Sequence, residues 1–379
     1  MQLFIGVLIG LIVLVILVVV HELAHAWVAK RNGVTVEEFG IGLPPKAWGK
    51  KLKNGVLFTL NWLPIGGFVK MQGEHDAARK PGDYGAAGFW GKTKILFAGV
   101  TANWLLAAFI FTILSIFGLP KVLPNQFMVA GDSTVINQPV EITGLTDGKP
   151  AAAAGLKVGD KVISFAGQKP STSDELSKLI SDNKGKTAQM TYSRGGSEST
   201  IDVALSDNAE GGILGINMGQ RSTIKSTWSA PIVGVVTTAQ FTWETLSGLG
   251  GLVANLFNGI TSQFDSDSAV RDQAAADLKM AGDSVAGPIG ILGTIFPAAS
   301  SAGPMQLLFL TAIISLTLAV MNILPIPALD GGRWVTMMLF RLTKRSLTFE
   351  REEKIQTIGF YILMGLIVLV TITDVAKIF

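Results

Sequence analysis

Two histidines and a glutamate stand together in the sequence His21-Glu22-Leu23-Ala24-His25, at the end of a long apolar run. On an α-helix, residues four apart lie on the same face, so both imidazoles can reach one metal ion. Glu22 projects from a neighbouring face, close enough to take a proton from a water molecule at that metal. This H-E-x-x-H pattern is typical of zinc hydrolases, with two histidine ligands and a glutamate as general base. A chance pentapeptide is the weaker interpretation, because two of the three histidines of the chain fall here.

A second polar motif ends another apolar run, where residues 322–332 read Asn-Ile-Leu-Pro-Ile-Pro-Ala-Leu-Asp-Gly-Gly. Pro325 and Pro327 remove backbone donors and disfavour helix before them, so a helix should break or kink here. Beyond the break, Asp330 offers a carboxylate that would complete a catalytic zinc site, with a fourth position left for water. Alternatively, Asp330 is the N-cap of a helix that begins near Trp334.

Four apolar segments are long enough to cross a bilayer, which takes about 20 residues. They are residues 3–29, 95–119, 305–324 and 358–372, the last of which is short. The first lacks the basic leading region and the small-residue cleavage site of a signal peptide, so we expect it to be retained. Both polar motifs therefore lie at the ends of membrane helices, where ionisable groups are costly and usually functional.

Charge asymmetry orients these helices. The loops between the first two and the last two segments are rich in Lys and Arg, whereas residues 121–285 contain more acidic than basic residues. The positive-inside rule places the basic loops in the cytoplasm, the middle region and both termini outside, and the metal site toward the cytoplasmic side. Within the middle region, residues 226–260 are expected to lie at the interface as an amphipathic helix, and residues 265–283 to be a mobile connector. His75, in the first basic loop, is expected to be a solvated loop residue.

The middle region contains one soluble domain, residues 140–219, with short strand-like runs between polar and glycine turns. Residues 151–163 resemble the bacterial PDZ signature, in which a small helix and G-L-x-x-G-D lead into a strand, here followed by a turn at residues 166–167. PDZ domains bind peptide C-termini by strand addition, and residues 144–145 are a candidate carboxylate loop. The favoured alternative is a size filter that keeps intact ectodomains away from the membrane site.

Taken together, the two metal motifs resemble the site-2 protease family of intramembrane zinc metalloproteases, in its RseP-type branch. RseP carries two PDZ domains in tandem, so this chain departs from that pattern in having one. Shorter matches extend the resemblance over nearly the whole chain: Gly-Gly-Phe-Val-Lys-Met at residues 66–71 with Gly73-Glu74, the G-x-x-x-N of residues 99–103, and Gly-Pro-Ile-Gly at residues 287–290.

The resemblance implies one zinc ion per chain, held by His21, His25 and Asp330, with Glu22 as the catalytic base. It also implies that three elements hold the substrate. The residues concerned are Asn322, Pro325 and Pro327 of the broken third helix, Gly67, Phe68 and Val69 of a membrane-associated hairpin, and Asn103 of the second helix.

Alternatives to these substrate-binding roles remain open. From the residues alone, Asn322 could equally make a hydrogen bond between helices, and for Asn103 a packing role is favoured. The hairpin is expected to join residues 56–62 and 68–71 through a turn at residues 64–67. Its edge could pair with an unwound substrate helix, or the hairpin could serve only as a peripheral anchor of the loop.

The predicted fold is a polytopic α-helical membrane protein with about four transmembrane helices, a membrane-associated β-hairpin and one inserted extracytoplasmic PDZ domain of the α+β class. The predicted segments are the first transmembrane helix 1–30, a cytoplasmic loop with the hairpin 31–94, the second helix 95–120, the PDZ domain with its flanks 121–222, an interfacial linker 223–304, the third helix 305–332, a cytoplasmic loop 333–357 and the fourth helix 358–379.

The predicted function is a zinc endopeptidase of the bacterial inner membrane that cuts single-pass membrane proteins within or near their transmembrane segment. The resemblance implies regulated intramembrane proteolysis of anti-sigma factors, other signalling proteins or signal-peptide remnants. A non-catalytic scaffold that binds partners through its PDZ domain is the alternative, and intact Glu22 argues against it. A transporter is weaker, because no inverted repeat is evident. A net charge of +3 over 379 residues gives no support for nucleic-acid binding, and a chain without cysteine forms no disulfide.

Overall fold

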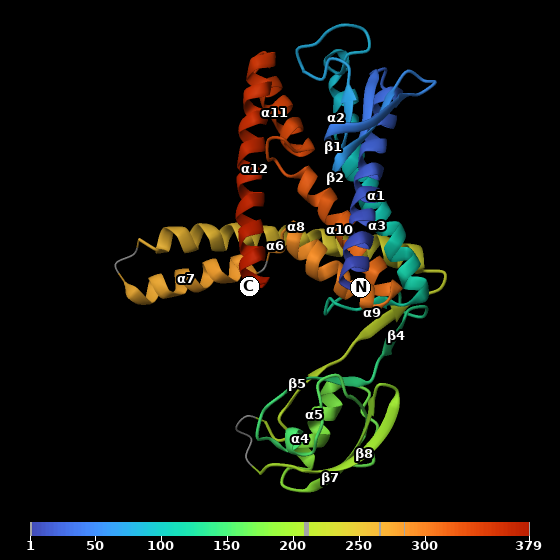
Figure 1. Ribbon diagram of the computed structural model, residues 1–379, viewed down its shortest axis with the longest axis vertical. Coiled ribbons are helices and arrows are strands. Elements are labelled where there is room, and N and C mark those ends of the chain that lie inside the picture. Colours follow the sequence, from blue (N-terminus) through green and yellow to red (C-terminus); the bar gives the residue numbers. More distant parts are fainter. Residues whose placement is uncertain (1, 208–211, 265–266, 284, 379) are drawn as a thin grey trace. The chain divides into compact units, whose positions relative to one another are not determined.

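The computed structural model describes residues 2–207, 212–264, 267–283 and 285–378. They form two compact units, Met1–Ile113 with Gly234–Phe379, and Leu114–Val233. Four helices in the described ranges are long and apolar enough to cross a membrane, which confirms the predicted number (Figure 1). They are α1 (Gln2–Arg31), α3 (Ala98–Phe117), α10 (Pro304–Ile323) and α12 (Phe349–Ile378).

The helix boundaries differ from the predicted segments in two places. The second segment is covered by two helices, α2 (Phe89–Leu96) and α3, with Phe97 between them. The third segment ends at Ile323, and a separate helix, α11 (Asp330–Leu342), occupies part of the predicted cytoplasmic loop. As a result, the buried Lys92 lies on α2, before the apolar helix α3. Asp330 lies at the start of α11 and is not part of the spanning helix α10.

A small sheet follows α1, and its pairing differs from the predicted hairpin. Its strands are β1 (Val36–Lys51) and β2 (Leu57–Met71), and both bend. Residues 38–41 pair on one side with residues 67–70 and on the other with residues 57–60. The two halves of β2 that the sequence predicts as partners therefore flank a strand of β1. Residues 67–70 lie at an edge of this sheet, because no other strand pairs with them in the described part of the chain.

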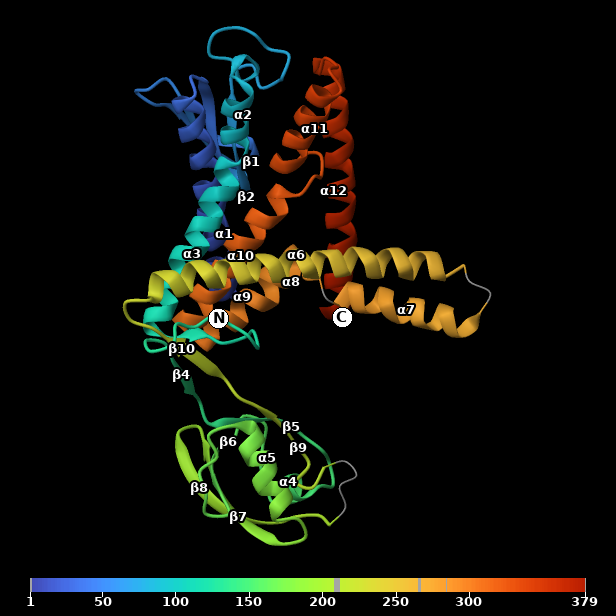
Figure 2. The same ribbon diagram turned by 180° about the vertical axis from the view of Figure 1, so that it is seen from behind.

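Helices α6 (Ala230–Ser262) and α7 (Ser268–Asp283) run across the direction of α1 and α12 (Figures 1 and 2). Phe241 anchors α6, since its ring lies 5.5 Å from that of Phe111 on α3 and 5.9 Å from that of Phe309 on α10, measured between centroids. Helix α7 packs on α6 at Gly259, where an added Cβ would lie 2.7 Å from Leu278. The predicted connector is thus helical from residue 268 onward, and residues 265–266 lie outside the described residues.

Short elements complete the first unit. They are a 3-10 turn (Tyr84–Ala86), α8 (Pro288–Gly290), a π-helical turn (Ile291–Ile295) and α9 (Phe296–Ala302). Asp374 on α12 accepts hydrogen bonds from the backbone N–H groups of Gly287 (3.0 Å) and Gly290 (2.7 Å). The Gly-Pro-Ile-Gly motif therefore receives a carboxylate at the start of α8, and this ties α12 to it.

The second unit is an α+β domain inserted between α3 and α6, as predicted. Its antiparallel sheet has the order β8-β7-β6-β5-β9 and runs from Val140 to Gly219. Gly144 and Leu145 lie within β5 and pair with β9, so the predicted carboxylate loop at residues 144–145 is wrong and β9 is the sheet edge at that end. The strands of this sheet are β5 (Val140–Leu145), β6 (Lys161–Phe165), β7 (Thr187–Arg194), β8 (Ser197–Ala204) and β9 (Ile216–Gly219). Two helices belong to the same part of the chain, α4 (Pro150–Ala153) and α5 (Ser173–Asp182). A smaller sheet contains β3 (Leu119–Pro120), β4 (Thr134–Asn137) and β10 (Ser222–Lys225).

The residues of the predicted PDZ signature make specific contacts in this domain. Asp160 is fully buried and accepts two hydrogen bonds from the guanidinium of Arg194, each 2.7 Å long. It also accepts the backbone N–H of Lys157 at 2.8 Å. The predicted turn at residues 166–167 is present, since both residues have positive φ. The signature aspartate therefore fixes the chain between α4 and β6.

Candidate metal centre and active site

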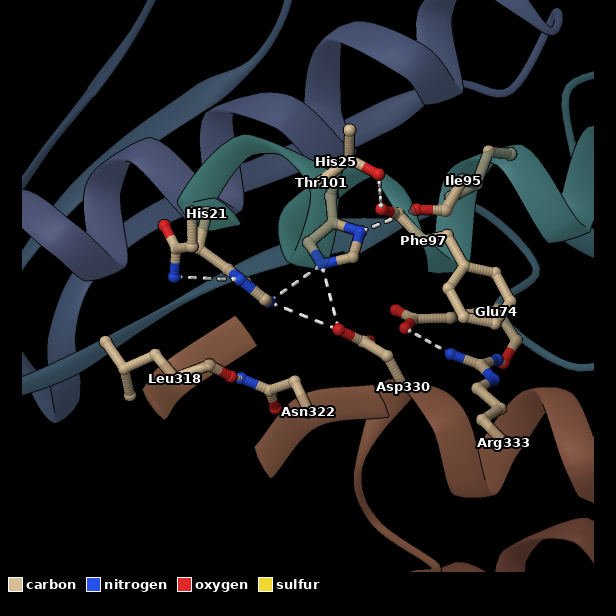
Figure 3. A network of polar contacts seen from close by, with 11 residues as sticks. His21, His25, Glu74, Ile95, Phe97, Thr101, Leu318, Asn322, Asp330 and Arg333 are labelled. Carbon is tan, nitrogen blue, oxygen red and sulfur yellow. Dashed lines mark hydrogen bonds and ion pairs between the residues drawn. The ribbon is translucent and has the colours of Figure 1, made fainter. Parts of the chain in front are cut away.

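The structure brings His21, His25 and Asp330 together. One possible ligand atom from each lies within 4.8 Å of the others. The Nε2 atoms of His21 and His25 lie 3.2 Å and 3.3 Å from Oδ2 of Asp330 and 3.1 Å from each other (Figure 3). Both histidines are buried, with 7% and 6% of their surface exposed. Three such atoms facing one point are the donor set of a catalytic zinc site, so the residues present fit this metal.

The second nitrogen of His25 indicates which tautomer it adopts. Its Nδ1–H donates to the carbonyl oxygen of Ile95, in the last turn of α2, over 2.8 Å (Figure 3). The proton therefore resides on Nδ1 and leaves the lone pair of Nε2 free for a metal. Outer hydrogen bonds of this kind orient metal-binding histidines in proteins generally.

Helix α3 approaches the two histidines closely because residue 99 is a glycine. A Cβ at Gly99 would lie 2.5 Å from Nε2 of His21 and 2.5 Å from Nε2 of His25. Any side chain here would occupy the space into which both candidate ligand atoms point. The sequence pattern G-x-x-x-N at residues 99–103 thus leaves room beside the metal position.

A break between α10 and α11 positions Asp330. Helix α10 ends at Ile323, Leu324 is extended, and α11 begins at Asp330 itself, with Leu329 as N-cap. The proposed N-cap role of Asp330 is therefore wrong, and its carboxylate contacts the histidines instead.

Two glycines after Asp330 let α11 fold back on this break. A Cβ on Gly331 would clash with the carbonyl of Ile323, and one on Gly332 with the carbonyl of Ile326. On the other side, Gly359 of α12 lies against Pro327. The segment 324–329 is held between α11 and α12, which fixes where the carboxylate stands.

Glu22 shares a small cavity with the three candidate ligands. The cavity measures about 200 Å³. Glu22 is half-buried, and it lies beside β2, since a Cβ on Gly67 would be 3.6 Å from its Cγ. The cavity is lined by His21, Glu22, His25, Val69, Met71, Glu74, Tyr84, Ile95, Leu96, Asn322, Ala328, Asp330 and Arg333.

Of the residues predicted to bind substrate, Asn322 and Val69 line this cavity, and Pro325, Pro327, Gly67 and Phe68 do not. Asn322 donates from Nδ2 to the carbonyl oxygen of Leu318 in its own helix, at 2.9 Å, instead of bonding to another helix (Figure 3). Asn103 does not line the cavity, and its side chain contacts Nδ1 of His21.

Arg333 is not among the predicted site residues. It follows Asp330 by one helical turn and reaches the loop after β2. Its guanidinium donates to Glu74 Oε1 at 2.8 Å (Figure 3). The same guanidinium lies 4.6 Å above the ring of Tyr84. Its Nε lies 3.4 Å from Oε1 of the buried Glu352 on α12. Burial raises the pKa of the Tyr84 hydroxyl, which stays neutral here. The i, i+3 spacing from Asp330 was the available signal, because it places Arg333 on the same helical face.

The third histidine differs from its prediction. His75 is half-buried, and its ring packs edge-on against Phe349, with 4.2 Å between centroids. It is a packing residue of the loop after β2 and is not part of the candidate metal cluster found in the described residues.

Comparisons with known proteins were made for the whole chain. The model of peptidase family M50 matches residues 9–366. A Clostridium perfringens protein named as a zinc metalloprotease is 30% identical, over 95% of each chain. The zinc metalloprotease RasP of Geobacillus kaustophilus is 28% identical over 96% of each chain, and the protein named Eep, described as a protease, of Enterococcus faecalis is 26% identical over 97% of this chain and 98% of its own. Among solved structures, the PDZ domain of an SdrC-like protein from Listeria monocytogenes matches 24% of this chain and 93% of its own, with 25% identity and a TM-score of 0.20.

Proposed function

This chain belongs to peptidase family M50, the site-2 protease family of zinc metalloproteases, and we propose that it cuts single-pass membrane proteins within or next to their transmembrane helix. The chain is accordingly a zinc-dependent membrane peptidase. The observation that carries the proposal is the meeting of His21, His25, Asp330 and Glu22 around one cavity, on and beside helices long enough to span a bilayer.

In this proposal His21, His25 and Asp330 hold zinc, which when bound supplies Lewis-acid chemistry that activates water and polarises the scissile carbonyl. Glu22 takes the proton of the attacking water onto its carboxylate and passes it to the leaving amine. Its place in the wall of the same cavity puts it within reach of both groups. Arg333 and Glu74 also line this cavity.

An extended substrate fits the open edge of β2. Residues 67–70 pair with β1 on one side only, and Val69 and Met71 line the cavity that contains Glu22. A peptide that adds to this edge would have its backbone held straight beside the base. Oδ1 of Asn322 makes no hydrogen bond within the described residues, so it can accept one from that backbone. The substrates proposed are anti-sigma factors, other signalling proteins or signal-peptide remnants.

The proposed location is the bacterial inner membrane, with the active site toward the cytoplasm and the inserted domain outside. The excess of Lys and Arg in the loops at the active-site end of the helices supports this orientation. The inserted domain would act as a size filter, or would bind a peptide C-terminus, and the edge strand for such binding would be β9.

The test combines zinc content with cleavage of a transmembrane helix in detergent, for wild type, Glu22→Gln and Asp330→Ala. We expect about one zinc per chain in wild type and Glu22→Gln, less in Asp330→Ala, and no cleavage by either variant. Stoichiometric zinc in a wild type that cuts no helix would favour a scaffold that acts through its inserted domain. A wild type without zinc would contradict the assignment of the metal centre.

A further inference from the structure

Asn103 is a fully buried polar residue whose amide meets the first candidate ligand. It lies on α3, one turn after Gly99, and its Nδ2 is 3.4 Å from Nδ1 of His21. Its backbone oxygen accepts the hydroxyl of Ser315 on α10 at 2.8 Å. Its Oδ1 is buried and has no hydrogen-bond partner within the described residues. A buried amide oxygen without a partner is costly, so it calls for a physical explanation.

The chemistry of a metal-binding histidine supplies that explanation. If His21 binds metal through Nε2, its proton resides on Nδ1, and Nδ1 becomes a donor. It would then face the Nδ2 group of Asn103, which is also a donor. Turning the amide of Asn103 by 180° exchanges its nitrogen and oxygen with almost no change of shape. Oδ1 then accepts the Nδ1 proton, which gives this oxygen a partner and removes the contact between two donors.

We propose that Asn103 is a positioning residue for the metal centre, whose amide oxygen accepts the Nδ1 proton of His21 and so aims Nε2 at the metal. The carbonyl of Ile95 does the same for His25. His25 then has its outer acceptor on α2, and His21 has its outer acceptor on α3. This role replaces both the substrate-binding and the plain packing interpretation of Asn103, and it rests on the proposed metal centre.

The experiment measures zinc affinity by competition with a chelator, on the full-length protein in detergent. Asn103→Leu keeps the size but removes the acceptor, and we expect zinc to bind about 10- to 100-fold more weakly. Asn103→Asp keeps an acceptor, and its affinity should stay within a few-fold of wild type. Ser315→Ala is the matched control, because it removes a buried hydrogen bond to the backbone of Asn103 and leaves the amide in place.

Cobalt in place of zinc gives a second readout, since its visible absorption reports ligand geometry. The bands should change in Asn103→Leu and stay unchanged in Ser315→Ala. Wild-type zinc affinity in Asn103→Leu would overturn the inference. A tenfold loss of zinc affinity in Asn103→Asp would overturn it too, and this second variant still gives a result if Asn103→Leu fails to fold. A wild type that binds no zinc would instead overturn the proposed function itself.

Discussion

At the scale of single residues, Arg333 links α11, the helix that begins at Asp330, to its surroundings. It reaches Glu74 after β2 and Glu352 on α12, and Glu352 also accepts the backbone N–H of Asp76 at 2.7 Å. The guanidinium of Arg333, on α11, thus contacts both α12 and the loop after β2. Because Asp330 lies one turn before it, the position of the carboxylate depends on this cation.

Replacing Arg333 by Met should lower both stability and activity. Glu352 has 4% of its surface exposed, so leaving it without a cation costs on the order of 3 kcal/mol. Cleavage should fall at least about tenfold, because small displacements of catalytic groups are expensive. Thermal unfolding and turnover are the measurements. Arg341→Met, on the same helix but exposed and stacked on Phe89, should change stability by less than about 1 kcal/mol; equal effects of the two variants would refute the linking role.

The Asp160 and Arg194 pair predicts how the inserted domain responds to pH. Hydrogen bonds from Arg194 lower the pKa of Asp160. A carboxyl group whose pKa is lower in the folded state adds stability above its unfolded pKa, about 4, and this stability is lost as pH falls through the folded value. The advantage of wild type over Asp160→Asn should therefore be full at neutral pH, begin to fall near pH 4 and be lost only as pH drops through the lower, folded-state pKa of Asp160. Hydrogen exchange of the sheet amides, corrected for intrinsic rates, measures it, and a pH-independent difference would contradict the prediction.

The candidate site residues could be predicted from the sequence because they occur in two short motifs of fixed spacing. His21, His25 and Asp330 converge as expected, and Glu22 lies in their cavity. Arg333 was not predicted because its partners, Glu74 and Glu352, come from other segments of the chain, and the sequence alone does not show which charged residues pair. Asn103 was visible as part of a motif, but its contact with His21 depends on how closely α3 approaches α1.

At the scale of elements, α3 and α11 approach the site through glycine. On α3, Gly99 admits the imidazoles of two other residues, and on α11, Gly331 and Gly332 admit the backbone of the break. These are close approaches of backbone that no larger residue allows. The local geometry of the metal centre therefore depends on how elements pack, as much as on the ligands.

Gly99→Ala should abolish most zinc binding while the helices still form. The new methyl would lie 2.5 Å from Nε2 of both histidines and displace them. Alanine also favours helix over glycine, so secondary structure should be kept. We expect zinc affinity to fall more than about tenfold, as judged by chelator competition. Gly365→Ala on α12 is the control, since an added Cβ there meets nothing within 4 Å; unchanged zinc binding in Gly99→Ala would show that α3 can move aside.

Elements were predicted well where local signals are strong. The two prolines end α10 near residue 323, and long apolar runs give the four spanning helices. The pairing of the small sheet was predicted wrongly, because strand register is set by contacts between residues far apart, and Pro44 and Pro45 hide the strand β1. Helix α7 was predicted to be a connector because it is mostly polar, and its packing on α6 at Gly259 depends on contacts that the local sequence does not show.

At the scale of the whole molecule, the absence of cysteine allows a direct test of orientation. Ser197→Cys lies at the exposed start of β8, and Lys53→Cys lies in the exposed turn between β1 and β2. A thiol reagent that cannot cross membranes should label Ser197→Cys in spheroplasts, and label Lys53→Cys only after permeabilisation. The native chain is an unlabelled control. The reverse labelling pattern would contradict this orientation, because it would place the inserted domain in the cytoplasm and the active-site loops outside.

The candidate metal ligands are far apart in the chain, since His21 and Asp330 are separated by 309 positions. Translation runs from the N-terminus, so the two histidines enter the membrane long before the aspartate is made. A nascent chain that has not reached residue 330, or a chain truncated before it, carries only two of the three candidate ligands and cannot assemble the centre. The candidate centre can therefore form only after the third spanning helix, α10, has been made and Asp330 has followed it.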